Sequence, residues 1–407
     1  MSFNIALSGL NAATADLGTI SNNIANANTS GFKQSRTEFG DLFRRSSYET
    51  SRTAAGAGVS VQRVAQQFDQ GTINSTGNSL DLAISGDGFF TLSDTNGARV
   101  YSRAGAFGTD RSGYVVNASG QRLQVYPPQN NGSTFNTGSL VDLRLSTSTS
   151  PPSATSEIEA NFNLVATASA PASATFSPDD ANSYNSTRSI TVYDSLGTPH
   201  TASMYFVKTA ATGAWDMHVA IDGTATGTPI ALQFDSSGTL TTPSNALASL
   251  GAVTLSNGAA PLSLSFDLAG TTQYGDTFSV GTLAQDGYAT GQLGGLSVTE
   301  GGVVQALFTN GQAVNIGQLA MASFPNMQGL QQQGSSGWVE TYSSGQSVLG
   351  VAGSAGFGTI QAGALESSNV DLTEQLVSMM TAQRNYQANS QVISTTDQLL
   401  QTIMNLR

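Results

Sequence analysis

The two histidines, His200 and His218, are the side chains in this 407-residue sequence that come closest to a catalytic or metal-binding pattern. His200 follows a Gly-Thr-Pro turn and His218 stands near Asp216, so that either could be placed in a Ser/His/Asp arrangement. Serine and aspartate are so frequent here that such proximity carries little information, and both histidines are expected to be exposed surface residues. Because they lie 18 positions apart on separate predicted strands, they do not form a histidine-based zinc motif.

The other residues with chemical potential also lack a functional spacing. Asp110, Asp179 and Asp180 do not follow the pattern of a calcium loop and are expected in turns. The glycine-rich segments 56–61 and 353–358 are not followed by the lysine of a phosphate-binding loop. Cysteine is absent, which excludes disulfides, thiol nucleophiles and cysteine-bound zinc. We therefore expect a protein that is not an enzyme, with no catalytic residue, no metal site and no cofactor.

Charge is scarce and unevenly distributed. Charged residues are 10% of the chain, against about 25% in an ordinary globular protein. Residues 1–144 carry a formal charge of +1 and residues 145–407 of −13, which is unsuited to binding nucleic acid. The one basic segment, 33–63, is consistent with a solvated linker or with a contact to the acidic half of a neighbouring subunit. Its basic residues are Lys33, Arg36, Arg44, Arg45, Arg52 and Arg63.

The sequence shows neither a membrane span nor a secretory leader. No uninterrupted apolar run approaches the roughly 18–20 residues that cross a bilayer. Lys33 is the first basic residue, so the positively charged start of a signal peptide is missing. If the protein leaves the cytosol, we expect it to do so without signal cleavage.

Both ends of the chain show the periodicity of amphipathic helices with a coiled-coil seam. The second helix has a start signal, because Ser368, Asp371 and Glu374 fit capping-box spacing. Residues 1–31 contain a single charge, Asp16, which is typical of a helix surrounded by neighbours rather than by water. The alternative is a helical pair lying on the body of its own chain. The expected seam residues, which we predict to drive polymerisation, are Phe3, Leu10, Leu17, Ile24, Leu372, Leu376, Met379, Tyr386, Ile393 and Leu400.

The middle of the chain shows the signals of β structure. The segment 189–208 alternates like a hairpin around Gly197, and Trp215, Met217 and Val219 fall on one face of a further strand. Ten of the eleven prolines lie between 127 and 261, which suggests an inserted domain. The predicted fold is multidomain and mainly β, with barrel- or sandwich-like domains and terminal α-helices that form a coiled-coil domain. The predicted parts are a helical domain (1–31 with 366–407), an extended linker (32–70), an inner β domain (71–145 with 286–365) and an outer β domain (146–285).

Several segments carry a family resemblance. The segment NNIANANTSGFK at 22–33 is similar to the N-terminal signature of the flagellar axial proteins, the rod and hook family. GDGFF at 86–90 and the segment 101–126 resemble the first β domain of that family, and 358–407 resembles its C-terminal helix signature. Segments 189–208 and 307–341 look most like those of the hook subunits. The positions that match the terminal motifs are Asn22, Asn23, Ile24, Ala25, Asn26, Asn28, Gly31, Phe32, Lys33, Ser368, Asn369, Val370, Asp371, Gln383, Arg384 and Asn389.

This resemblance implies a structural role in the bacterial flagellum, outside the cell. In the family, the terminal helices line a hollow tube, an inner β domain forms its shell and an inserted domain lies outermost. The hook is a curved, flexible tube that acts as a universal joint and transmits torque from rod to filament. The implied partners are further copies of the chain, the distal rod protein, the hook cap, the hook–filament junction protein, the hook-length control protein and the flagellar type III export apparatus.

Three other functions are open to the sequence. The distal rod protein shares both terminal signatures, although it would lack a large insertion such as 146–285. An extracellular β-rich adhesin that binds glycans would account for the acidic, Ser/Thr-rich middle, although it would not need two charge-depleted terminal helices. A secreted hydrolase would need a nucleophile and base, for which the sequence offers no convincing pair.

Overall fold

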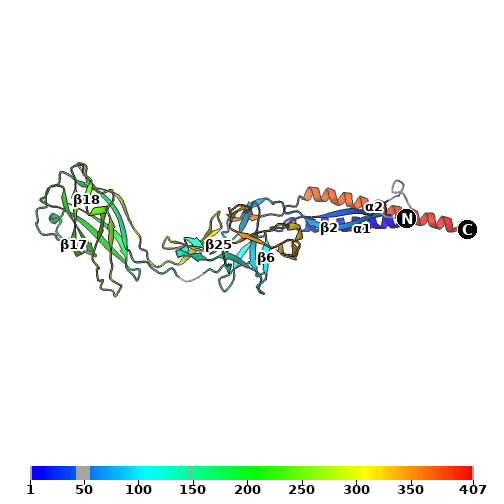
Figure 1. Ribbon diagram of the computed structural model, residues 1–407, viewed down its shortest axis with the longest axis horizontal. Coiled ribbons are helices and arrows are strands. Elements are labelled where there is room, and N and C mark those ends of the chain that lie inside the picture. The colour runs from blue at the N-terminus through cyan, green and yellow to red at the C-terminus, as the bar shows by residue number, and fades with distance from the viewer. Residues whose placement is uncertain (1, 43–55, 146–148, 406–407) are drawn as a thin grey trace. The chain divides into compact units, whose positions relative to one another are not determined.

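The structure is a computed structural model that describes residues 2–42, 56–145 and 149–405. The described chain is mainly β with one long helix near each end, as predicted (Figure 1). It divides into two compact units, which we call unit 1 (Met1–Ser146, Gly295–Leu307 and Ala313–Arg407) and unit 2 (Thr147–Gly294 and Phe308–Gln312). In the described ranges, no helix is long and apolar enough to cross a membrane.

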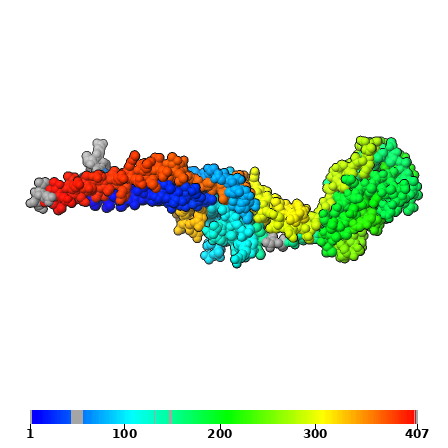
Figure 2. Space-filling view, turned by 180° about the vertical axis from the view of Figure 1, so that it is seen from behind, coloured from blue at the N-terminus to red at the C-terminus, as the bar shows by residue number. Residues whose placement is uncertain are grey.

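The helices α1 (Ser2–Ala25) and α2 (Leu372–Asn405) lie side by side within unit 1, as seen from opposite sides in Figures 1 and 2. They run antiparallel, because Gly9 near the start of α1 faces Asn389 late in α2, whereas Asn23 bonds to Gln375 at the start of α2. The predicted start signal of α2 is confirmed: the Asp371 carboxylate accepts hydrogen bonds from the first free amides of the helix.

A hairpin replaces much of the predicted linker. Strands β1 (Ser35–Leu42) and β2 (Gly58–Gln66) pair antiparallel, with an irregularity beside Phe39, and both pack against α1. The expectation of an extended segment over 32–70 was therefore wrong for these residues. The physical reason is that two runs containing β-branched or aromatic residues satisfy each other's backbone groups and gain a helix to pack on. Of the basic segment, Arg44, Arg45 and Arg52 lie outside the described residues, whereas Arg36 and Arg63 are exposed and both contact Glu38.

The rest of unit 1 is built on a sheet with strand order β23-β24-β25-β9-β5-β6-β28-β27, to which β12, β26, β29, β7 and β8 attach. In that order the strands are Leu293–Val298, Val303–Phe308, Ala313–Leu319, Arg122–Tyr126, Phe89–Ser93, Arg99–Ser102, Gly337–Val339 and Gln331–Gly334. The attached strands are Val141–Asp142, Met321–Ser323, Val348–Gly350, Phe107–Thr109 and Val115–Asn117. Side chains from both halves of the chain fill its core, including Phe90, Leu92 and Met321.

Three small ladders complete unit 1. The pairs are β3 (Ile73–Ser75) with β31 (Ala364–Glu366), β4 (Leu82–Ser85) with β30 (Thr359–Ala362), and β10 (Pro128–Gln129) with β11 (Thr134–Phe135). The short 3-10 turns η1 (Asn130–Gly132) and η4 (Met327–Gly329) also belong to this unit. The β3–β31 ladder brings the chain just after the hairpin next to the chain just before α2. A second, aromatic cluster lies near this junction, formed by Phe89, Tyr101, Phe324 and Trp338 with Phe68 packed against them.

Unit 2 consists of two five-stranded sheets around one core. One sheet contains β13 (Glu157–Val165), β19 (Leu247–Ser249), β20 (Ser265–Asp267), β21 (Thr272–Tyr274) and β22 (Ser279–Gln285). The other contains β14 (Ser186–Tyr193), β15 (Pro199–Lys208), β16 (Ala214–Ile221), β17 (Thr224–Phe234) and β18 (Leu240–Thr242). The turns η2 (Ala181–Ser183) and η3 (Ser244–Ala246) connect strands. The predicted hairpin over 189–208 is confirmed as β14–β15, and Trp215, Met217 and Val219 point into the core as expected.

Candidate assembly surface at the terminal helices

Small and polar side chains bring the two helices together. Along α2 the residues Gln375, Ala382 and Asn389 recur every seven positions; the first two are buried and the third is half-buried. A Cβ atom added to Gly9 would lie 2.7 Å from the Asn389 amide oxygen, so glycine allows α1 to approach α2 closely there. On α1, Ala6, Ala12, Ala13 and Ile20 are buried.

A buried amide fixes the end of α1. Asn23 is 1% exposed, and its side-chain nitrogen donates to the Gln375 amide oxygen at 3.0 Å and to the Ser35 carbonyl at 2.8 Å. Its side-chain oxygen accepts from the Ser35 backbone amide at 2.9 Å. The Asn23 side chain therefore joins α1 to both α2 and β1. Its amide is a buried polar group whose oxygen and nitrogen are both hydrogen-bonded.

Three buried charged residues join the helices to the sheet. Lys33 Nζ lies 2.7 Å from Glu366 Oε1 and Arg103 Nη1 lies 3.3 Å from Glu366 Oε2, and all three side chains are at most 4% exposed. The Lys33 ammonium also donates to the Asp69 carbonyl and the Arg103 guanidinium to the Gly86 carbonyl. Burial lowers the pKa of both Lys33 and Arg103, and the Glu366 carboxylate opposes that shift.

Other family-motif residues support the same junction. Gly31 has φ +66°, and a Cβ there would lie 2.4 Å from the Ala104 backbone nitrogen, so any larger residue would strain the turn and clash. Asn369 accepts from the Gln34 amide at 2.8 Å and donates to the Gln67 carbonyl at 2.9 Å. The motif thus encodes the place where the chain leaves α1 and returns to α2.

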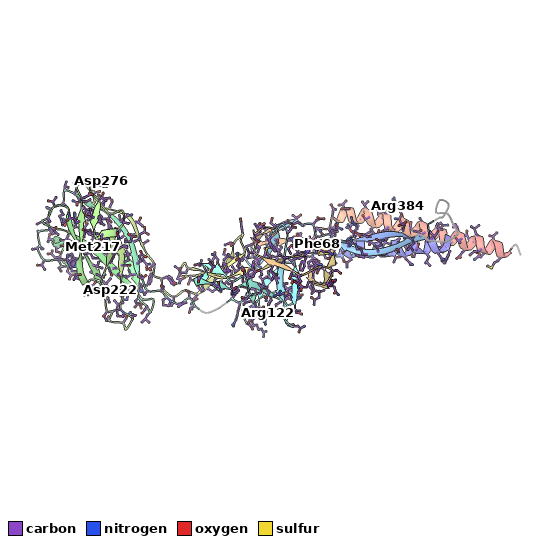
Figure 3. All side chains as sticks on the ribbon, in the orientation of Figure 1. Phe68, Arg122, Met217, Asp222, Asp276 and Arg384 are labelled. Carbon is purple, nitrogen blue, oxygen red and sulfur yellow. The ribbon has the colours of Figure 1, made fainter. Side chains whose placement is uncertain are left out.

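The remaining motif residues are not gathered at this junction. Phe32 is buried, and Ile24 and Val370 are half-buried. Asn26 and Ser368 make local hydrogen bonds. Asn22, Ala25 and Asn28 on the N-terminal side, and Gln383 and Arg384 on α2, are exposed; Arg384 is labelled in Figure 3.

The predicted seam residues have two different environments within one chain. Leu10, Leu17, Met379 and Ile393 are half-buried, like Ile24. Phe3, Leu372, Leu376, Tyr386 and Leu400 are between 38% and 52% exposed. These five belong to a larger set of exposed apolar side chains on the helices, which we call the helix ridge: Phe3, Ile5, Leu7, Leu372, Leu376, Val377, Met380, Tyr386, Val392, Leu399, Leu400 and Met404.

Sequence reasoning missed four residues of this region. Arg103 and Glu366 complete the charged junction, and Gln375 and Ala382 form the contact between the helices. Lys33 held a usable signal: it is one of only two lysines, and it stands in an otherwise uncharged motif. A lone lysine of this kind needs a buried partner if it is itself buried. The inner row of α2, which is Gln375, Ala382 and Asn389, could not be recognised in the sequence, because these residues do not form an apolar stripe.

The histidines in unit 2 differ from the prediction of exposed residues. The His200 ring is 11% exposed and lies between two carboxylates, with Nδ1 2.6 Å from Asp222 Oδ2 and Nε2 3.3 Å from Asp194 Oδ2. His218 is half-buried and stacks on Phe176 with ring centroids 4.0 Å apart. The expectation was wrong because tertiary neighbours that are distant in sequence cover both rings. Both carboxylates at His200 hold loops together, and Asp222 accepts the Thr201 amide.

Four family models match successive parts of the chain. Residues 3–33 match "Flagella basal body rod protein" and residues 83–161 match "Flagellar hook protein FlgE/F/G D1 domain". Residues 163–288 match "Flagellar basal body protein FlaE D2 domain", and residues 361–406 match "Flagellar basal body rod FlgEFG protein C-terminal".

Whole-length comparisons agree with these models. The chain is 38% identical to the flagellar hook protein FlgE of Escherichia coli strain K12 and 40% identical to that of Salmonella typhimurium strain LT2, covering 100% of each pair of chains. Among solved structures, the crystal structure of Helicobacter pylori flagellar hook protein FlgE2 has a similar fold. It superposes with a TM-score of 0.52 at 14% identity, over 72% of this chain and 100% of that one.

Proposed function

The chain belongs to the flagellar hook protein family, and from that premise we propose which of its surfaces build the hook. Members of this family are structural, not enzymatic, and this chain is a hook subunit located in the bacterial flagellum, where it assembles with its own kind. The proposal is that the helix ridge forms the contact between neighbouring subunits. The terminal helices would then line the tube, with the inner β domain (71–145 with 286–365) as its shell and the outer domain (146–285) outermost.

One observation carries this proposal: the row of α2 nearest α1 is made of small and polar residues, and many large apolar side chains of both helices are left exposed. Twelve such side chains make up the helix ridge, whereas the row of α2 nearest α1 is Gln375, Ala382 and Asn389. Contact between the two helices leaves these twelve apolar side chains exposed to solvent. Large exposed apolar surfaces of this kind mark interaction sites. Charge adds to the argument, because α2 carries only Glu374, Arg384 and Asp397 in the range from Leu372 to Asn405. Few ion pairs would have to be desolvated as subunits pack.

The same assembly supports the finer functions. Strong helix contacts would hold the tube, while the polar, charge-poor outer domains would exchange wet contacts at low cost as a curved, flexible hook rotates and transmits torque. The contacts at its two ends would be with the distal rod protein and with the hook cap and junction protein. The hook-length control protein and the type III export apparatus would act on the chain before or during assembly, and export would leave the N-terminus uncleaved.

The experiment is a charge substitution on the helix ridge. Leu376 is 52% exposed in the single chain, so Leu376→Asp should leave the melting temperature of the monomer unchanged. In a polymer the new carboxylate would be buried without a partner, which costs several kcal/mol, and tubes should be lost. Ammonium sulfate, which screens charge and strengthens apolar burial, would start polymerisation, and electron microscopy would show the tubes.

The matched control is Gln387→Asp, an exposed polar position of the same helix. It should still give tubes, although the added charge is the same. Tubes formed equally well by Leu376→Asp would remove the helix ridge from the subunit contact. A lowered monomer melting temperature for Leu376→Asp would instead show that this residue stabilises its own chain.

A further inference from the structure

One aromatic side chain of unit 1 is presented to solvent without any contact of its own. Tyr342 has a relative exposure of 104%, and it lies in the loop between β28 and β29. The loop around it is nevertheless firmly held. The buried Ser344 hydroxyl accepts from the Thr341 amide at 2.9 Å, and the Asn326 side chain donates to the Ser343 carbonyl at 2.9 Å. The backbone is therefore fixed while the ring is free.

This combination is typical of an interface anchor. A tyrosine has only two side-chain torsions, so it loses little entropy when it is buried against a partner. The loop that carries it is already ordered, so binding would not have to order the backbone as well. Tyrosine is also among the residues that most often dominate binding energy when they fill a pocket.

A pocket suited to such a ring lies on the same unit. It has a volume of about 250 Å³ and lies where β1, β2 and the chain around η4 meet. Its apolar walls are Val64, Phe68, Met327 and Leu330, and Figure 3 labels Phe68 at the junction of the hairpin and the sheet. No charged side chain is among its lining residues.

Parts of this pocket are left exposed in the single chain. Val64 is 52% and Met327 38% exposed, whereas the Phe68 ring forms the packed side of the wall, 5.7 Å from the rings of Phe89 and Trp338. Glutamine side chains supply polar groups: Gln66 accepts the Trp338 indole N–H, and Gln332 is exposed. An apolar wall with amides beside it matches a phenol, whose ring is apolar and whose hydroxyl needs a partner.

We propose that Tyr342 of one subunit inserts into this pocket of a neighbouring copy of the chain. The occupant is a second copy because a subunit that assembles with its own kind carries both halves of a contact between neighbours. Unit 1 carries both a projecting ring and an open apolar pocket. Val64 of the pocket belongs to β2, which packs against α1, one of the two helices that carry the helix ridge. This inference rests on the proposed function, because it adds a second contact to the one made by the helix ridge.

The first test compares two substitutions of the anchor in the full-length chain. Tyr342→Ala should raise the protein concentration at which tubes form by about tenfold or more, as for loss of an interface anchor. Tyr342→Phe keeps the ring and should stay within about threefold of the unchanged protein, since a hydrogen bond of a neutral hydroxyl is a modest contribution. The control is Tyr274→Ala, a 51% exposed tyrosine of unit 2 that should leave this concentration unchanged. Equal polymerisation of Tyr342→Ala and the unchanged chain would overturn the proposal.

The second test uses the absence of cysteine from the chain. Tyr342→Cys and Val64→Cys are made as separate proteins, mixed, polymerised and treated with a short bis-maleimide. The mixture should give covalent dimers, while each variant alone and the mixed monomers should not. A mixture of Tyr274→Cys with Val64→Cys is the control and should not cross-link.

The outcomes separate this contact from the assembly itself. Tubes from the mixture without dimers would place Tyr342 away from the pocket and overturn the proposal. Tyr342→Cys on its own could fail to form tubes while its monomer keeps an unchanged melting temperature. That result would support the proposal, as would weaker polymerisation of Tyr342→Ala. If the unchanged chain formed no tubes under any condition, the assembly function would be what had failed.

Discussion

Lys33 Nζ and Glu366 Oε1 lie 2.7 Å apart, although the two residues are separated by 333 positions of sequence and neither is more than 1% exposed. Lys33 follows α1 and Glu366 ends β31, six residues before α2 begins. The pair therefore fixes the point at which both terminal helices leave the β structure of unit 1. Arg103, from the chain after β6, binds the other oxygen of the same carboxylate.

Loss of this carboxylate should destabilise unit 1. Glu366→Gln would leave two buried cations without a counter-charge, and breaking a buried ion pair in this way costs about 3–5 kcal/mol. The measurement is urea unfolding followed by the fluorescence of Trp338, one of two tryptophans in the chain, with Trp215 in unit 2 replaced by Phe. Glu38→Gln removes the partner of the two exposed residues Arg36 and Arg63 and should leave the urea midpoint unchanged. Equal midpoints for the two variants would contradict a structural role for the Glu366 cluster.

The close approach of the helices should depend on a small residue at position 382. Ala382 is 1% exposed, so Ala382→Leu would overpack the contact between α1 and α2, at a cost of about 1–3 kcal/mol. We expect a loss of helical circular dichroism in the monomer and faster amide exchange along α1. Ala388→Leu makes the same change at an exposed position of α2 and should keep the helical signal. If both variants kept full helicity, the inner row of α2 would not hold α1.

The stability of unit 2 should change with pH through its two histidines. The hydrogen bond to Asp222 raises the pKa of His200 against the effect of burial, and Asp194 adds to the rise. Burial alone would raise the pKa of Asp194, but hydrogen bonds from Asn257, the Thr198 amide and His200 outweigh it and lower that pKa to about 2. Protonated His200 therefore adds to the free energy of unfolding of unit 2. This contribution is complete below about pH 6.5, the pKa of histidine in the unfolded chain, and is lost as pH rises through the higher pKa of the folded protein. Ionised Asp194 also adds to the free energy of unfolding. This contribution is present above the pKa that Asp194 has in the unfolded chain and is lost as pH falls towards 2.

His218 acts in the opposite direction. Burial lowers its pKa, so its contribution is present above about pH 6.5 and is lost as pH falls through the lower folded value. We expect proton NMR of the imidazole rings to give a pKa above about 6.5 for His200 and below it for His218, each assigned by His200→Asn and His218→Asn. In His218→Asn, unit 2 should lose stability between neutral and mildly alkaline pH, whereas the double variant should not. A His200 pKa at or below that of a free histidine would contradict the contacts of its ring with the Asp194 and Asp222 carboxylates.

The sequence by itself determined the two terminal helices, the β14–β15 hairpin and the family to which the protein belongs. The 3- and 4-residue spacing at both ends specified two helices, because the pattern of a 3.6-residue repeat is local. The alternation around Gly197 specified the β14–β15 hairpin for the same reason. The motif at 22–33 identified the family, and the structure shows what three of its residues do. Asn23 bonds to α2, Gly31 leaves room for the Ala104 backbone, and Lys33 pairs with Glu366.

Only the tertiary structure decided which residues meet. Periodicity marks the apolar rows of a helix but does not say which row faces which partner, so Gln375 and Ala382 on the inner row of α2 were not predicted. Glu366 and Arg103 could not be assigned to Lys33, because a charge pair separated by hundreds of residues leaves no local pattern. The pair of carboxylates around His200 has the same origin, since Asp222 reaches the ring only when β15 pairs with β16. Local hydrogen bonds and hydrophobic periodicity depend on residues that are close in sequence and can be predicted from it. The burial of a side chain depends on which distant segments of the chain pack against it.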